Sequence, residues 1–295
     1  MAKARAIATR RKSVESIKKI TYTMQLIATA RFQKALTRAT ETKPYTEKIT
    51  ELVRQVSASG AAAEHPLLQV NADAKRHALL LITSNRGFCG GYNGNLLRTA
   101  MSLVTANGDA GITTDLFVIG KKGVNYLSFL GHDLAQTYPD LPDAPEFAEV
   151  EVIASGFMKD YEAKTYDAVH VVYMKFITTS RQTAEAMTLL PIKSEDDSAD
   201  TEQPAKGGVE VQYDFSPEPS ILLRELLPVT VKVRLFQCFS DAAVSENVAR
   251  MVAMKSASDS ARDMAKSLAQ KFNRARQSQI TTELLDIMGG VEALK

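Results

Sequence analysis

The segment from Ser84 to Leu96, SNRGFCGGYNGNL, has the composition of a turn that could hold a phosphate. A strand-like run precedes its glycines and a helical pattern follows, and backbone amides at such a helix start bind anions. The glycines fit neither G-x-G-x-x-G nor G-x-x-x-x-G-K-[ST], and no Lys follows to reach a phosphate. Nucleotide binding stays open as an alternative, but a tight turn and close helix–strand packing are favoured.

Neither the histidines nor the cysteines have the spacing of a metal or nucleophile site. No His, Cys or carboxylate stands at ligand spacing from any of the histidines. His170 falls inside an apolar run, which favours a structural role. Cys89 and Cys238 lack the surroundings of a catalytic nucleophile and suit a reducing compartment. We therefore expect no catalytic residue, no metal site and no cofactor. The other histidines are His65, His77 and His132.

Basic residues are concentrated at the start of the chain. Residues 1–40 carry ten basic side chains and one acid, whereas residues 143–225 carry 17 acids and seven bases. A basic segment attracts an acidic or phosphate-rich partner. The run at 10–12 and the pair Lys18–Lys19 leave nucleic acid open, but the absence of interleaved aromatics favours a protein partner.

The segment RARQSQITTELLDIMGG (274–290) combines a helical pattern with closely spaced polar groups. Residues three and four apart share a helix face, so Gln277, Thr281 and Leu284 form one stripe. Arg276, Gln279, Ile280 and Glu283 form the neighbouring stripe. Such a surface could make and break polar contacts with a changing partner.

Two long helices are predicted at the ends of the chain. The first glycine is Gly60, so residues 3–57 favour one helix, which Pro44 is expected to bend or loosen. Apolar residues recur at helical spacing over residues 241–288, with Asp241 as the expected N-cap and Gly289 as the stop.

The middle of the chain predicts an α/β sheet. Apolar runs at 79–83, 113–120 and 168–176 alternate with helical patterns. Residues 209–215 suggest an edge strand, and 229–239 a further strand before the last helix. The expected domains are 1–60 (N-terminal coiled-coil helix), 61–228 (central Rossmann-like α/β domain with an acidic loop at 193–208) and 229–295 (C-terminal strand and coiled-coil helix).

The fold class expected is therefore α/β, with a long antiparallel coiled coil of the terminal helices. Counting outward from the central domain pairs residues whose numbers add to roughly 300. Met24 is then expected level with about Arg276.

Composition is that of a globular chain. The 295 residues are 45% hydrophobic, and 36 basic against 34 acidic residues give a net charge of +2. No run approaches the ~20 apolar residues of a membrane-spanning helix, and the N-terminus lacks the apolar core of a secretory signal. We expect a soluble intracellular protein.

Three segments in register resemble the gamma subunits of the rotary (F-type) ATP synthases. These are RKSVESIKKITYTMQLIATARFQKA (11–35), the Gly-rich segment, and ENVARMVAMKSASDSA with RARQSQITTELLDIMGG. The likeness covers both ends strongly and the middle loosely. Asn85 replaces the usual Asp, and Val291 the usual Ala. Cys89 and Cys238 do not match the redox-controlled pair of the plant form.

The resemblance implies a non-catalytic rotary shaft. Its coiled coil turns inside a ring of alpha and beta subunits, while the α/β domain and the epsilon subunit stand on a membrane-embedded ion-driven ring. It couples ion flow through that ring to ATP synthesis or hydrolysis. The location implied is peripheral, on the cytoplasmic face of a bacterial inner membrane, with no nucleic acid and no direct membrane insertion.

The resemblance also implies partner-binding residues. Arg276 and Gln277 match a pair that hydrogen-bonds a beta-subunit loop, and Thr281 and Glu283 match polar positions linked to coupling. Met24 matches a position where an added positive charge disturbs coupling. The remaining matches, to basic positions near acidic beta-subunit loops, are Lys18 and Lys19.

Two alternatives remain at this point. A nucleotide-binding α/β enzyme with helical oligomerisation arms would rest on the Gly-rich segment. A nucleic-acid-binding coiled coil would rest on the basic first helix, with an affinity that falls steeply with salt.

Overall fold

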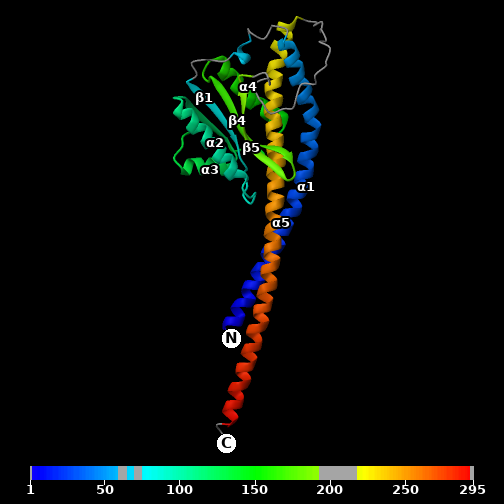
Figure 1. Ribbon diagram of the computed structural model, residues 1–295, viewed down its shortest axis with the longest axis vertical. Coiled ribbons are helices and arrows are strands. Elements are labelled where there is room, and N and C mark those ends of the chain that lie inside the picture. The colour runs from blue at the N-terminus through cyan, green and yellow to red at the C-terminus, as the bar shows by residue number, and fades with distance from the viewer. Residues whose placement is uncertain (1, 59–64, 70–74, 193–217, 293–295) are drawn as a thin grey trace, which may run out of the picture. The chain divides into compact units, whose positions relative to one another are not determined.

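The computed structural model describes residues 2–58, 65–69, 75–192 and 218–292. The chain begins with one long helix, α1, and ends with another, α5; the strands and the shorter helices lie between them in the sequence (Figure 1). The elements are α1 (Ala2–Ala58), η2 (Pro66–Leu68), β1 (Arg76–Ile82), α2 (Tyr92–Asp109), β2 (Thr113–Ile119), α3 (Lys121–Phe129), β3 (Leu134–Tyr138), α4 (Phe147–Glu162), β4 (Ala168–Thr178), β5 (Arg181–Leu190) and α5 (Pro219–Glu292).

The sheet has the order β3-β2-β1-β4-β5. Strands β1 to β4 pair in parallel, and β5 pairs with β4 as an antiparallel hairpin. The predicted strands at 79–83, 113–120 and 168–176 correspond to β1, β2 and β4. The expected Rossmann-like α/β domain is confirmed, although α3, β3 and β5 were not predicted.

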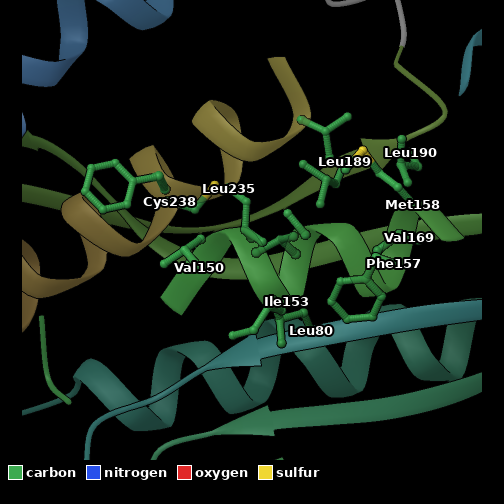
Figure 2. Packing of buried hydrophobic residues seen from close by; sticks show 14 of the residues in the cluster. Leu80, Val150, Ile153, Phe157, Met158, Val169, Leu189, Leu190, Leu235 and Cys238 are labelled. Carbon is green, nitrogen blue, oxygen red and sulfur yellow. The ribbon is translucent and has the colours of Figure 1, made fainter. Parts of the chain in front are cut away.

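The main core lies on one face of the sheet. Because successive strand residues point to opposite faces, Ala78, Leu80 and Ile82 of β1 all enter this core. Helix α4 packs there with Val150, Ile153 and Phe157, and α5 covers it (Figure 2). Helix α2 lies on the opposite face of β1.

The predicted strand at 229–239 is wrong, because this segment is part of helix α5. Its valines alternate with polar residues and have high strand propensity. The buried positions nevertheless recur at helical spacing, and packing against the core outweighs the local preference. The buried side chains at this helical spacing, within 229–239 and on either side of it, are Leu223, Leu227, Val231, Leu235, Cys238 and Ala242.

Two expected helix boundaries are corrected as well, and the single helix expected over residues 3–57 is confirmed. Asp241 lies inside α5 rather than at its N-cap, and accepts a 2.9 Å hydrogen bond from Gln237 Nε2 one turn earlier. Gly289 does not end α5, which continues to Glu292. Helix α1 continues past Pro44, and threonine hydroxyls on both sides of this residue donate to carbonyls four residues back.

The chain forms two compact units. One comprises residues 1–30 with 249–295, and the other residues 31–248. In the first unit, α1 and α5 run antiparallel, as expected. Val14 packs there with Ala261 and Leu268, beside Ile7 and Ala265. This lean interface of small and aliphatic side chains is the coiled coil predicted from sequence.

The expected register of the helix pair is wrong. The guanidinium of Arg11 lies over the ring of Phe272, so paired numbers add to 283 rather than about 300. The sequence estimate counted outward from residue 241, but α5 begins at Pro219. Met24 is therefore level with about residue 259, roughly 25 Å along the helix from Arg276 at 1.5 Å per residue.

Two sequence predictions lie outside the described residues: the acidic loop at 193–208 and the edge strand at 209–215. Across the part of the chain that the structure describes, no helix is both long and apolar enough to span a membrane.

Candidate functional site

The predicted partner-binding residues of α5 lie together near its C-terminal end. Arg276, Gln277, Thr281 and Glu283 are all exposed within about two helical turns. The Thr281 hydroxyl donates to the Gln277 carbonyl at 3.0 Å, and Gln279 Nε2 donates to Glu283 Oε1 at 2.8 Å. The side chains of Arg276 and Gln277 therefore face solvent as donors available to a partner.

Exposed apolar side chains surround this polar cluster. Between Leu284 and Met288 every residue except Asp286 is apolar, so the apolar surface extends around more than one face of α5. Sequence reasoning noted only Ile280 and Leu284, although the run LLDIM at the end of a polar helix was a usable signal. The exposed set is Ile280, Leu284, Leu285, Ile287, Met288 and Val291.

The register places this end of α5 past the start of α1. Arg11 pairs with Phe272, so the numbers of paired residues add to 283. Ala2, where α1 begins, therefore lies level with about Thr281. The segment 282–292 therefore extends beyond α1. We call the exposed segment 276–291 of α5 the helix tip.

Helix α1 supplies the other predicted residues, but at a different level. Lys19 is exposed, whereas Lys18 and Met24 are half-buried. By the observed register they lie level with residues from about 259 to 265 of α5. The structure thus brings together the four polar residues of the helix tip, and it does not bring Met24, Lys18 or Lys19 to them.

The Gly-rich segment forms a self-contained turn. Asn93 Oδ1 accepts from the Ser84 amide at 3.1 Å, and its Nδ2 donates to Ser84 Oγ at 2.8 Å. The same Nδ2 lies 3.3 Å from Cys89 Sγ, which is buried as a packed thiol. Gly90 has a φ of 57°, a backbone conformation that residues with L side chains rarely adopt, and this explains why a glycine stands at position 90.

Among the residues that the structure describes, the cavity beside this turn is too small for a nucleotide. The cavity beside Thr83, Asn85 and Tyr92 measures about 20 Å³, the size of a water molecule. Ligand pockets for drug-sized molecules measure hundreds of Å³. The expected close packing of helix and strand occurs instead at Gly120 and Gly123, where an added Cβ would lie within 3 Å of Thr83.

Two of the four histidines are neighbours, contrary to their isolation in the sequence. His77 of β1 and His170 of β4 approach to 3.3 Å between Nδ1 and Nε2, because parallel pairing sets Leu79 opposite His170. His170 Nδ1 also meets the Thr188 hydroxyl at 3.2 Å. Burial lowers the pKa of His77. The pair has structural partners, as expected for His170, and among the described residues no group of three metal-ligating side chains occurs.

The second cysteine lies in the core. Burial raises the pKa of Cys238 and of the neighbouring Tyr173, so both stay protonated. Burial also raises the pKa of Asp241 from 3.8 to about 6, although the hydrogen bond from Gln237 opposes this shift. Cys238 is therefore a packing residue rather than a nucleophile.

Taken together, these features define a class of protein. An exposed helix tip with mixed polar and apolar side chains accompanies an α/β domain whose Gly-rich turn has only a water-sized cavity beside it. This class is an α/β domain with two long terminal helices, of which the last presents a large exposed surface that a partner could contact.

Comparison with known proteins identifies the family. The ATP synthase family model matches residues 3–294. The ATP synthase gamma chain of Rhodopirellula baltica is 45% identical over 295 residues, with all of both chains covered. That of Saccharopolyspora erythraea is 36% identical over 308 residues, covering all of this chain and 98% of the relative. The chain therefore belongs to the ATP synthase gamma chain family, as its sequence resemblance indicated.

Solved structures share the fold. A chain of the Euglena gracilis mitochondrial ATP synthase, from a structure of OSCP, F1 and the c-ring, has a TM-score of 0.68. It is 18% identical, with coverage of 99% of this chain and 95% of that one. A chain of the Tetrahymena thermophila central stalk and c-ring has a TM-score of 0.58 and 20% identity, covering 81% of this chain and 99% of that one. Membership of the gamma chain family, rather than this shared fold, makes the protein a non-catalytic central-stalk subunit of a rotary ATP synthase.

Proposed function

We propose that this chain turns inside a ring of alpha and beta subunits and presents a different face to each beta subunit in turn. Rotation of an asymmetric surface biases each catalytic site among states that it already possesses. The coupling free energy then comes from contacts that differ between those states. The exposed helix tip, with donors on one side and apolar residues around it, is the observation that carries this proposal.

Within the tip, Arg276 and Gln277 would hydrogen-bond a beta-subunit loop. Both side chains are exposed, with Gln277 one turn before Thr281 and Arg276 about two turns before Glu283, so the four form one polar surface. A guanidinium beside an amide suits a loop that presents carboxylates and carbonyls. The half-buried Lys18 and the exposed Lys19 would face acidic loops of the same ring, and Met24 would lie at a further level of the shaft.

The α/β domain would contact the epsilon subunit and the membrane-embedded ring. Peripheral placement on the cytoplasmic face of a bacterial inner membrane is proposed on two grounds. The two relatives compared above match over the full chain and are bacterial, and no spanning helix is found in the described residues. The domain boundaries at residues 60 and 228 are likewise proposals, and the second of them falls inside helix α5.

Reconstitution tests the proposal. The purified chain is mixed with alpha and beta subunits, and ATPase activity and sedimentation are compared with and without it. One copy entering a large complex and raising sustained turnover is the expected result. Failure to associate, or equal activity without the chain, would overturn the shaft assignment.

The two other functions predict different outcomes in the same preparation. Micromolar binding of ATP or NAD by the isolated chain would support an enzyme, and the water-sized cavity argues against it. Salt-sensitive binding of nucleic acid would support the third function. Family membership favours neither.

A further inference from the structure

A guanidinium joins three elements in the unit formed by residues 31–248. Arg38 of α1 donates from Nη2 to the Pro145 carbonyl at 2.8 Å, and from Nη1 to the Ala144 carbonyl at 3.4 Å. These carbonyls lie just before α4, which begins at Phe147. One side chain of the long helix is thereby fastened to the loop that starts a helix of the α/β domain.

The other long helix shares this contact. The Arg38 Cζ lies 5.1 Å from the centroid of the Phe236 ring of α5. Phe236 in turn meets the Phe147 ring edge to face at 5.5 Å and 72°. Arg38, Phe236 and Phe147 therefore form a stack that joins α1, α5 and α4. We call these three residues, with the carbonyls of Ala144 and Pro145, the clamp.

The clamp is closely packed and its chemistry is specific to arginine. The space lined by Ala35, Arg38 and Phe239 measures only about 20 Å³. A planar guanidinium can donate two bonds in one direction while its face lies on a ring, whereas an ammonium cannot do both. A positive charge near a helix N-terminus is also disfavoured by the helix dipole. Arg38 is thus placed against an electrostatic preference.

Neighbouring contacts reinforce the same loop. Asn85 Nδ2 donates to Asp143 Oδ1 at 2.9 Å, and Asn85 Oδ1 accepts from the Lys121 amide at 3.2 Å. Arg31 of α1 lies 3.8 Å from the other oxygen of Asp143. An Asp at position 85 would bring a second carboxylate to Asp143, so the Asn suits this loop. The loop is held from α1 on one side and from the end of β1 on the other.

We propose that Arg38 is a positioning residue that transmits torque between the paired long helices and the α/β domain. The inference rests on the proposed shaft function, in which the helices and the domain must turn together under load. Rotation or sliding of α1 against α4 would break both carbonyl bonds and unstack Phe236. Stiffness of this joint, rather than folding alone, is the property that the clamp supplies.

The test uses the complete ATP synthase in membrane vesicles carrying Arg38→Gln or Arg38→Lys. ATP hydrolysis and ATP-driven transport of the coupling ion are measured on the same vesicles, per assembled complex. For Arg38→Gln we expect hydrolysis to persist while the ratio of ions moved to ATP hydrolysed falls to roughly half or less. Arg38→Lys keeps the positive charge but loses the planar guanidinium with its two donors. Its ratio of ions moved to ATP hydrolysed should therefore lie between that of Arg38→Gln and that of the unmodified protein.

Lys34→Gln is the matched control, because it removes a positive charge from an exposed position one turn earlier on α1. A ratio in Arg38→Gln equal to that of the unmodified protein, or an equal fall in Lys34→Gln, would overturn the inference. If Arg38→Gln does not assemble, Phe236→Leu decides. Phe236→Leu keeps the hydrogen bonds from Arg38 to the two carbonyls and removes the aromatic ring beneath the guanidinium. An unchanged ratio of ions moved to ATP hydrolysed would again contradict the clamp.

Torsional stiffness separates the clamp from a purely stabilising contact. With the alpha and beta ring stalled, rotational fluctuations of a bead on the α/β domain should widen in Arg38→Gln and stay unchanged in Lys34→Gln. Equal fluctuations would exclude the torque role even if stability fell. Failure of the unmodified protein to couple transport to hydrolysis would instead count against the proposed shaft function.

Discussion

The guanidinium carbon of Arg11 in α1 lies 5.8 Å from the centroid of the Phe272 ring in α5. This pair fixes the register of the antiparallel helices, together with the small cluster around Val14 and Leu268. The cluster is the apolar part of an otherwise polar interface. Its side chains should therefore dominate the stability of the helix pair.

Leu268→Ala is expected to lower the free energy of unfolding by about 2 kcal/mol, since it removes a large buried side chain from a cluster that can partly close. Met264→Ala is the control, because Met264 lies on the same helix and is 48% exposed. Urea denaturation of the full chain measures both. Equal losses in the two variants would show that the cluster does not stabilise the pair.

Met24→Lys is expected to impair coupled turnover more than folding, because a new charge in the shaft would lie close to partner subunits without a counter-ion. Met24→Leu should leave turnover nearly unchanged. Turnover and ion transport of the assembled complex are the measurements. Loss of folding in Met24→Lys with normal coupling in the remaining complex would contradict the prediction.

The same substitution tests the register. Met24 lies roughly 25 Å from Arg276 along the helix pair, so Met24→Lys and Arg276→Gln should have additive effects on the free energy of unfolding, within about 0.5 kcal/mol. Strong mutual compensation in the double variant would support the register expected from sequence, with the two residues side by side.

Gln277→Leu is expected to weaken the contact of the helix tip with the beta subunit by about 1–2 kcal/mol, as for a hydrogen bond lost with partial desolvation. Stability of the isolated chain should not change, because the Gln277 side chain is exposed and its carbonyl still accepts from Thr281. Binding to the alpha and beta ring and coupled turnover are measured, with Lys271→Gln as control. Unchanged binding and turnover would remove Gln277 from the mechanism.

Asp241→Asn is expected to raise the free energy of unfolding at pH 8 by about 2 kcal/mol. Burial raises the pKa of Asp241 to about 6 in the folded chain, against 3.8 as its ordinary value. Below pH 4 the carboxyl is protonated in both states. As the pH rises from 4 to 6, the unfolded state ionises first, so stability falls; above 6 the loss is complete.

The variant keeps the hydrogen bond from Gln237 and lacks this fall, so its advantage should disappear at pH 4. Asp263→Asn, an exposed acid on the same helix, should show no such pH-dependent gain. Unfolding curves at pH 4, 6 and 8 measure the effect. A gain in Asp241→Asn of equal size at pH 4 and pH 8 would rule out ionisation as its cause.

The sequence predicted the architecture well where local pattern and burial agree. Strands β1, β2 and β4 are buried apolar runs, and α1 follows from a stretch without glycine. Residues 229–239 were misassigned because the segment fits both patterns: Val231, Val233 and Leu235 alternate, whereas Val231, Leu235 and Cys238 follow helical spacing, and all of them are buried. Only the packing of α5 against α4 distinguishes the two, and that is tertiary information.

The candidate site was predictable to a similar extent. Arg276, Gln277, Thr281 and Glu283 share one helix, so helical spacing alone brings them together. The residue of α5 that lies beside Met24 depends on where α5 begins. Because the start of α5 was misplaced, the expected position of Met24 along α5 was wrong by several helical turns. The clamp at Arg38 could not be found from sequence, because its carbonyl partners belong to a loop more than a hundred residues away.

The close helix–strand contact at Thr83 is a second feature that could not be located from the sequence. The sequence pointed to the glycines of the Gly-rich segment, whereas the close approach is at Gly120, whose φ is 90°. A Cβ built there would lie 2.2 Å from the Thr83 carbonyl oxygen. The Thr83 hydroxyl donates to the Ile119 carbonyl at 2.7 Å and accepts from the Gly123 amide at 3.0 Å. These bonds fasten the ends of β1 and β2 to the start of α3.

Gly120→Ala is therefore expected to lower the free energy of unfolding by about 3 kcal/mol or more, from backbone strain at positive φ together with a clash against a backbone oxygen. Gly156→Ala should be neutral or raise it by up to about 1 kcal/mol, since a helical glycine with open space beside it gains from the methyl group. Thermal and urea unfolding of both variants provide the comparison. A Gly120→Ala protein as stable as Gly156→Ala would show that the β2–α3 turn can relax away from Thr83, and that the contact is not a fixed point of the fold.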